Sequence, residues 1–275
     1  AMSYGNLGVV YDNLGDYDKA LEYYNKSLEI RKDVLGENHP DTADSYNNIG
    51  VVYDKLKDYN KALEYYNKAL EIRKAVLGEN HPNNAVSYNN IGNVYLNLGN
   101  YDKALEFKNK ALEIRKDVLG EKYPDTADSY NNTGLIYFNL GEYDKALEYY
   151  IKALEITKEV LGENHPDTAS SYNNIGAVYY NLGDYDKALE YFNKALEIYK
   201  VVSGENHPRT AMSYNNIGVV YDELGKYDKA LEFKNKALEI FKEVFGESHP
   251  YTQTTIENIE IAKQNLEESQ GKTEE

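Results

Sequence analysis

The sequence predicts an all-α solenoid, in which short helices pair and the pairs stack in chain order. Three observations predict this fold class. The 275-residue chain repeats itself with a period of 42 residues and no insertions. Apolar and small residues recur at three- and four-residue spacings within each copy, and all six prolines occupy one equivalent position, from Pro40 to Pro250. A fixed period of this length is typical of an array whose units bury their apolar faces only against their neighbours.

Six full copies and the first half of a seventh can be aligned. The copies span residues 3–44, 45–86, 87–128, 129–170, 171–212 and 213–254. We expect one solenoid over residues 1–275, closed by a capping helix at about 252–268 and followed by a frayed tail at 269–275. Glu260 and Lys263 stand where the other copies have a packing Gly and Tyr, which indicates a polar cap. The first copy begins abruptly at Ser3, which suggests an array cut from a longer protein.

The first helix of each copy is illustrated by the second copy. It is expected to begin after Pro40, where Asp41 or Thr42 can cap the exposed amides, and to end near Leu56. At about 100° per residue, one of its faces should meet the second helix of the same copy. The residues on that face are Tyr46, Ile49, Gly50 and Tyr53. A neighbouring face, with Ser45, Val52 and Leu56, is expected to meet the next copy.

A short break separates this helix from the second one, which should run from about Tyr59 to Leu77 and stop at Gly78. The break usually contains a glycine, as at Gly15, Gly99 and Gly141, because glycine readily adopts the left-handed conformation that closes a helix. Lys57 is the exception, and we expect it to cost a little stability.

The repeated residues also resemble a known family. The first copy shows the pattern in Tyr4, Leu7, Gly8, Tyr11, Ala20, Tyr24 and Leu28. This pattern resembles the tetratricopeptide repeat, with Tyr at the first position where the family often has Trp, and the long unit is similar to the repeats of kinesin light chains. The resemblance implies a right-handed superhelix whose first helices line a concave groove for peptides or partner helices. No heptad coiled coil accompanies the repeats, so a motor-adaptor role has no support.

Composition argues against several classes of function. The formal net charge of −16 disfavours nucleic acid, because phosphate binding needs clustered Lys and Arg. There is no cysteine, no run of 18 apolar residues and no secretory leader pattern, so we expect a cytoplasmic protein that does not bind membranes. The five histidines lie at equivalent joins rather than in one cluster, which predicts a turn role and no metal site. No catalytic motif or phosphate loop appears, so neither an enzyme nor a cofactor is expected.

Asparagine pairs recur on the first helices and suggest a way to hold a peptide. The pairs are Asn47 and Asn48, Asn89 and Asn90, Asn131 and Asn132, Asn173 and Asn174, and Asn215 and Asn216. A side-chain amide offers donors and an acceptor to a peptide backbone, and the resemblance implies the same use. The alternative, that the second Asn of each pair bonds a neighbouring copy, is equally open.

Differences between copies single out other residues of the expected groove. The positions equivalent to residues 2, 5, 6, 9, 12 and 13 share the face of the first helix that packing leaves over. Its middle is apolar, and we expect one patch across three copies, formed by Leu96, Leu135, Phe138, Ala177 and Tyr180, with Asn93 also in the groove. Its ends are acidic, with Asp12, Asp54, Asp222 and Glu223. Exposed apolar surface usually marks a binding site, although drift among duplicated copies would also produce such differences.

The sequence therefore predicts a non-catalytic scaffold that binds a protein or peptide with an apolar centre and basic ends. The alternatives are a structural spacer, a module that associates with itself, or the regulatory arm of a larger multidomain protein.

Overall fold

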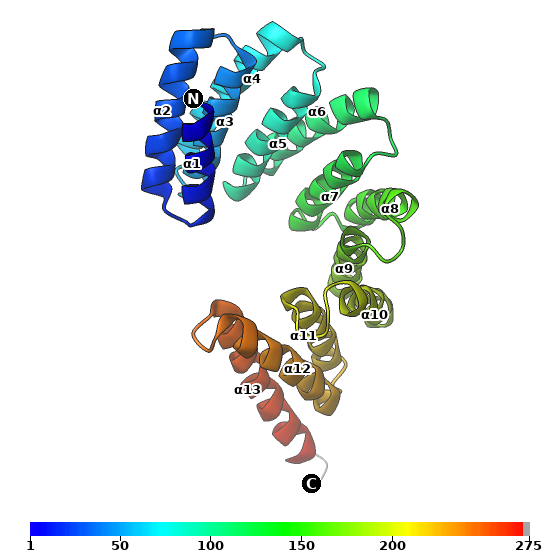
Figure 1. Ribbon diagram of the computed structural model, residues 1–275. Coiled ribbons are helices and arrows are strands. Elements are labelled where there is room, and N and C mark those ends of the chain that lie inside the picture. The colour runs from blue at the N-terminus through cyan, green and yellow to red at the C-terminus, as the bar shows by residue number, and fades with distance from the viewer. Residues whose placement is uncertain (272–275) are drawn as a thin grey trace. The chain divides into compact units, whose positions relative to one another are not determined.

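The computed structural model describes residues 1–271, and this range contains thirteen α-helices and no β-strand (Figure 1). The all-α prediction is confirmed. The first helices of the copies, called helices A, are α1 (Met2–Asn13), α3 (Pro40–Lys55), α5 (Pro82–Asn97), α7 (Pro124–Asn139), α9 (Pro166–Asn181), α11 (Pro208–Glu223) and α13 (Pro250–Gly271). The second helices, called helices B, are α2 (Tyr17–Leu35), α4 (Tyr59–Leu77), α6 (Tyr101–Leu119), α8 (Tyr143–Val160), α10 (Tyr185–Val202) and α12 (Tyr227–Phe245).

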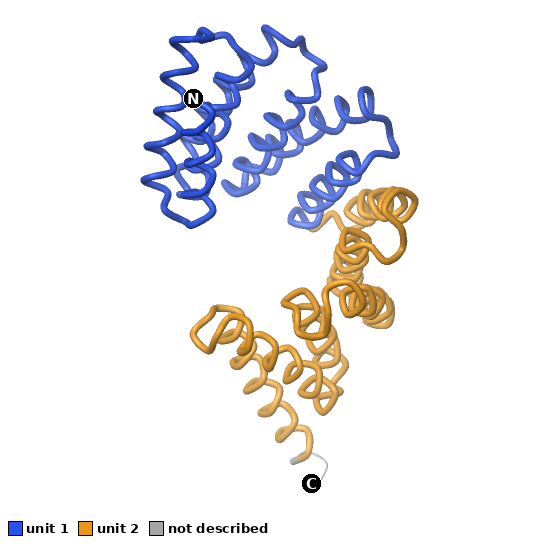
Figure 2. Tube along the Cα trace, viewed as in Figure 1, with its two compact units in different colours: residues 1–140 blue, residues 141–275 orange. Residues whose placement is uncertain are grey.

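Contacts group the chain into two compact units, residues 1–140 and residues 141–275 (Figure 2). Unit 1 contains α1 to α7 and unit 2 contains α8 to α13. In unit 2 the last helix packs on α12 through Ile259 and Ala262, and it exposes Glu260 and Lys263 as expected of a polar cap. This helix begins at Pro250 and includes residues 269–271 of the expected tail, whereas residues 272–275 lie outside the described range.

Histidine, rather than Asp41 or Thr42, caps the start of α3. The His39 Nδ1 atom accepts a hydrogen bond from the Asp41 amide at 3.1 Å, while the Thr42 hydroxyl donates to the Gly36 carbonyl at 2.9 Å. The cap prediction is therefore wrong. The following proline disfavours the helical conformation in the residue before it, and the resulting extended backbone carries the imidazole to the free amide two residues on. The same contact is made by His81, His165, His207 and His249.

Lys57 closes α3 with φ 60°, and it is the only non-glycine residue with positive φ in the described range. Glycine takes this place in other copies, for example Gly15 with φ 75°. A Cβ in the left-handed region approaches the following carbonyl oxygen too closely, at a cost of about 1–2 kcal/mol. The expected small instability at Lys57 therefore has a local structural cause.

We expect Lys57→Gly to raise the free energy of unfolding by about 1 kcal/mol, because it removes this strain. Urea unfolding followed by circular dichroism measures the change. Lys57→Ala is the matched control, since it removes the charge and keeps the Cβ. Equal stabilisation by the two variants would assign the effect to charge and would contradict the strain explanation.

Around α3 the core forms a layer in which this helix A lies between two helices B, α2 and α4. One cluster joins Tyr24 of α2, Ile49 and Val52 of α3, and Ile72 of α4, all at most 8% exposed. Gly50 lets α3 approach its own helix B, since a Cβ there would lie 2.7 Å from the Tyr66 ring. The predicted contact of this face is confirmed.

The neighbouring face of α3 meets the preceding copy and not the next one. Val52 packs in the cluster that includes α2, and the Arg31 side chain of α2 donates to the Ser45 hydroxyl at 2.7 Å. The direction predicted for this face is therefore wrong. Periodicity identifies a second apolar face on a helix, but only the path of the chain decides which neighbour covers it.

Candidate functional site: the helix-A face

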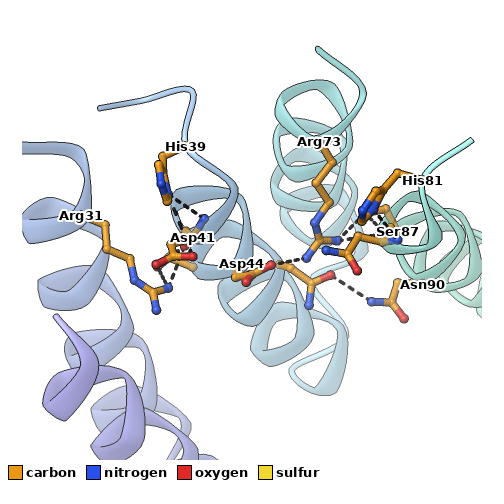
Figure 3. A network of polar contacts seen from close by, with 11 residues as sticks. Arg31, His39, Asp41, Asp44, Arg73, His81, Ser87 and Asn90 are labelled. Atoms are coloured by element: carbon orange, nitrogen blue, oxygen red, sulfur yellow. Dashed lines mark hydrogen bonds and ion pairs between the residues drawn. The ribbon is translucent and has the colours of Figure 1, made fainter. Parts of the chain in front are cut away.

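The asparagine pairs form bonds between neighbouring copies on the helix-A face, defined as the positions equivalent to residues 2, 5, 6, 9, 12 and 13. In unit 1 the Asn90 amide donates to the Asn47 side chain at 3.1 Å, as Figure 3 shows around Asn90. Asn132 donates to Asn89 at 3.4 Å. In unit 2 Asn216 donates to Asn173 at 2.9 Å. For the second Asn of these three pairs, the alternative role of bonding a neighbouring copy is confirmed.

The same asparagines keep hydrogen-bonding capacity after these bonds are made. A side-chain amide has two N–H donors and an oxygen with two lone pairs, and each bond between copies uses one donor and one lone pair. All ten residues of the pairs, including Asn48, Asn131, Asn174 and Asn215, are half-buried. The amides can therefore hold the copies in register and still keep hydrogen-bonding groups that these bonds do not use.

The variable apolar residues divide between the two units. On unit 1, Leu96 and Phe138 are half-buried and Leu135 is 39% exposed. On unit 2, Ala177 and Tyr180 are half-buried and pack against the core cluster of α10, α11 and α12. Each unit thus presents its own apolar surface on the helix-A face.

The acidic residues predicted for the groove ends make contacts within the protein. Asp12 pairs with Lys55 of the next helix A at 2.7 Å, and Asp222 pairs with Lys234. Their charge is partly neutralised, so the ends of the face are less acidic than the residue count suggests.

The other two acids have different surroundings. Burial raises the pKa of the Asp54 carboxyl above its ordinary value, against an opposing hydrogen bond with the Asn97 side chain. Glu223 is exposed and accepts hydrogen bonds from the hydroxyls of Tyr180 and Tyr185, at 3.1 and 3.4 Å. Burial, and next its own hydrogen bond to Glu223, raise the pKa of Tyr180 to about 12.

Sequence reasoning missed the helix-B residues that reach this face. Arg73 of α4 is 5% exposed, donates to the Ser87 hydroxyl at 2.7 Å and pairs with Asp44 at 2.6 Å (Figure 3). In unit 2 the equivalent residue is Tyr199, whose hydroxyl lies 2.8 Å from that of Ser170. Tyr199 lines a cavity of about 240 Å³ together with Asn173, Asn174, Arg209 and Met212. The change from Arg73 to the equivalent Tyr199 is visible in the sequence and was the signal that could have identified this position.

Lys108 of α6 is a second residue that sequence reasoning missed. Its side chain is 1% exposed and lies over Gly92 of α5. The Nζ atom donates to the Asn89 and Asn93 side-chain oxygens, at 2.7 and 2.5 Å. Burial, with a smaller contribution from the nearby Arg115 charge, lowers the pKa of Lys108 to about 7. Four other copies have an aromatic residue at this position, namely Tyr24, Tyr66, Tyr150 and Phe192, so the substitution itself was the signal.

The helix-A face therefore carries side-chain amides, apolar side chains and a few charges. Among residues 1–271 there is no group of three or more His, Cys, Asp or Glu side chains placed to hold a metal ion. No helix in the described part of the chain is long and apolar enough to cross a bilayer.

Comparison with known proteins places these features in a family. A profile of the tetratricopeptide repeat matches residues 1–75, 55–117, 83–143, 125–200 and 169–243. A search of curated proteins gave no match. Among solved structures, BtubC (BKLC) from P. vanneervenii is 26% identical, with a TM-score of 0.72 over 85% of this chain and 94% of that one.

Two further structures share the fold at lower identity. A putative kinesin light chain from Podosopora anserina is 20% identical, with a TM-score of 0.64 over 75% of this chain and 98% of its own. The apo form of RapI is 21% identical, with a TM-score of 0.67 over 97% of this chain and 98% of its own. The chain therefore belongs to the tetratricopeptide repeat family, in the long form of about 42 residues per repeat, and has the all-α fold of stacked helix pairs seen in kinesin-light-chain-like arrays.

Proposed function

We propose that this protein is a non-catalytic scaffold that binds an extended segment of a protein or peptide on its helix-A face. The fold is typical of protein-interaction scaffolds, which are generally not enzymes. The side chains of the helix-A face suit binding rather than catalysis.

One observation carries the proposal: the copies agree where they pack and differ on the helix-A face. An alanine near the start of helix A is fully buried in five of the helices A, as Ala43, Ala85, Ala127, Ala169 and Ala211. By contrast, the position equivalent to residue 12 reads Asp12, Asp54, Leu96, Phe138, Tyr180 and Asp222. A position needed only for stacking is expected to stay the same in every copy. A position that contacts successive residues of a ligand is expected to vary, because those residues differ.

The ligand is held in two ways under this proposal. The remaining donors and acceptors of the asparagine pairs bind its backbone, and the apolar side chains bind its own apolar residues. Leu96 and Phe138 serve unit 1, and Tyr180 serves unit 2. The acidic ends favour Lys or Arg, and because two of the acids are already ion-paired, we expect charge to affect the association rate more than the affinity.

The test is a peptide selected against the protein from a random library and measured by calorimetry. We expect the Phe138→Ala/Tyr180→Ala double variant to weaken binding by at least about 1–2 kcal/mol, with helicity unchanged. Val201→Ala on α10 is the matched control, because Val201 is 76% exposed and lies away from helix A.

Unchanged affinity in the double variant would contradict the proposal. If no peptide is selected and the mass rises with concentration in sedimentation, the chain is instead a self-association module.

A further inference from the structure

The fourth copy, residues 129–170, has a polar residue in its core where its neighbours have an apolar one. Thr133 of α7 stands at the position of an isoleucine in α3, α5, α9 and α11, and each of those isoleucines is 0% exposed. Thr133 is also 0% exposed, and its hydroxyl has no hydrogen-bond partner among residues 1–271. Burying an unpaired polar group is costly. This layer of unit 1 is therefore less stable than a layer built on isoleucine.

The helix B of the fourth copy lacks a hydrogen bond to the helix A that follows it. In the first three copies Arg31, Arg73 and Arg115 each donate to a serine of the following helix A, at 2.7, 2.7 and 2.6 Å. The equivalent residue of α8 is Thr157, whose hydroxyl donates to a carbonyl of its own helix at 3.1 Å. The serine that follows, Ser171 of α9, is 0% exposed, and its hydroxyl has no partner in the described range. A bond between α8 and α9 in unit 2 is thus missing.

Both helices of the fourth copy also begin without a side-chain cap. Tyr123 precedes α7 and makes no cap bond, whereas a histidine caps the helix at this position in five other copies. Glu142 precedes α8 without a cap bond, whereas Asp58, for example, accepts a hydrogen bond from the Lys61 amide before α4 at 3.3 Å. In the sixth copy α12 alone lacks such a cap. Loss of a cap destabilises the first turn of a helix.

These four features coincide in one part of the array. Each copy of such an array is stabilised by its own helices and by its immediate neighbours. Missing contacts in one copy therefore lower the free energy of local opening there more than in distant copies. The boundary between the two compact units, Leu140 and Gly141, also falls between α7 and α8 (Figure 2).

We propose that the fourth copy is a built-in opening point of the array, and that a peptide on the helix-A face holds it closed. In the open state α7 and α8 unfold locally while α5, α6, α9 and α10 stay folded. Opening removes Leu135 and Phe138 from the helix-A face, so this face is complete only in the closed state. A ligand that binds only the closed state shifts the population toward it. The closing role of the peptide rests on the proposed function, whereas the opening does not.

Hydrogen exchange of the full chain without ligand, followed by mass spectrometry, tests the opening. We expect the amides of α7 and α8 to exchange at least about tenfold faster than the equivalent amides of α5, α6, α9 and α10. A tenfold ratio corresponds to about 1.4 kcal/mol in the free energy of opening. Equal rates in the six helices would overturn the inference.

Two variants restore missing contacts and test their role. Thr133→Ile gives α7 the residue of its counterparts, and Thr157→Arg gives α8 an arginine that can donate to Ser171. Each should slow exchange in its own helix at least about tenfold. Ile175→Thr is the matched control, because it places the same hydroxyl in the core at α9 and should speed exchange there. Unchanged exchange in both restoring variants would refute the assignment of the opening to these contacts.

The closing role is tested with the peptide selected from the random library. At saturation we expect it to slow exchange in α7 at least about tenfold. A peptide that binds in calorimetry without slowing exchange in α7 would refute the closing role and leave the proposed function standing. If no peptide binds, the proposed function and the closing role both fail, whereas faster exchange of α7 and α8 in the free protein still establishes the opening point.

Discussion

Replacing Tyr66 with alanine is expected to lower the free energy of unfolding by about 3–5 kcal/mol. Tyr66 is 2% exposed and belongs to the core cluster that joins α4, α5 and α6. Its ring lies against Gly50, which has no side chain to move into the vacated space. The cavity would therefore persist, and the cost should fall near the upper end for a large-to-small substitution. Urea unfolding followed by circular dichroism at several protein concentrations measures it.

Tyr66→Phe is the control for this experiment. It keeps the ring and removes only the hydroxyl, so we expect a change of less than about 1 kcal/mol. A loss in Tyr66→Phe as large as in Tyr66→Ala would show that the hydroxyl, and not the packing of the ring on Gly50, stabilises this layer.

Lys108→Tyr is expected to stabilise the protein most at neutral and acidic pH, and its advantage should shrink by about 2–4 kcal/mol between pH 7 and pH 9.5. The pKa of Lys108 is lowered from 10.5 to about 7 in the folded protein, chiefly by burial and further by Arg115. Below about pH 7 both states carry the proton, and the folded state bears the full cost of the buried charge. Between pH 7 and 10.5 the unfolded state binds more protons than the folded state, so the stability of the parent rises with pH.

The measurement is the difference in urea-unfolding free energy between the parent and the variant across this pH range. Lys103→Tyr is a useful control, because this residue lies on the exposed surface of the same helix. A constant difference between the parent and Lys108→Tyr from pH 6 to pH 9.5 would contradict a buried ammonium at this position. The result does not depend on any ligand, so it tests only the protonation of Lys108 in the folded protein.

Local features explain why the helices could be predicted from the sequence. The bounds predicted for the second helix of the second copy, Tyr59 to Leu77, are those observed for α4. The glycine at the end of this helix and the apolar spacing within it both act over a few residues. The cap at His39 was missed because an imidazole acceptor depends on the backbone angle that the following proline imposes, which the general preference for Asp or Thr does not include.

The candidate site could be predicted only in part, for a different reason. The asparagine pairs and the variable apolar residues were identified because they repeat or differ at a fixed position. The internal pairing of the acids was not, because Asp12 meets Lys55 from a helix 43 residues away. Such a contact depends on how far two helices are offset, which no local pattern records.

The sequence by itself determined the repeat, the pairing of helices within each copy, the bounds of the second helix of the second copy, and the face of helix A that meets its own partner. These follow from periodicity and from residues that start or stop a helix, and both act over short distances along the chain. Only the tertiary structure decided that the second face meets the preceding copy, and that Arg73 and Lys108 of helices B reach the helix-A face. Long side chains end where the packed backbones leave room, as Lys108 does over Gly92, so their chemistry depends on contacts between helices rather than on position in the repeat.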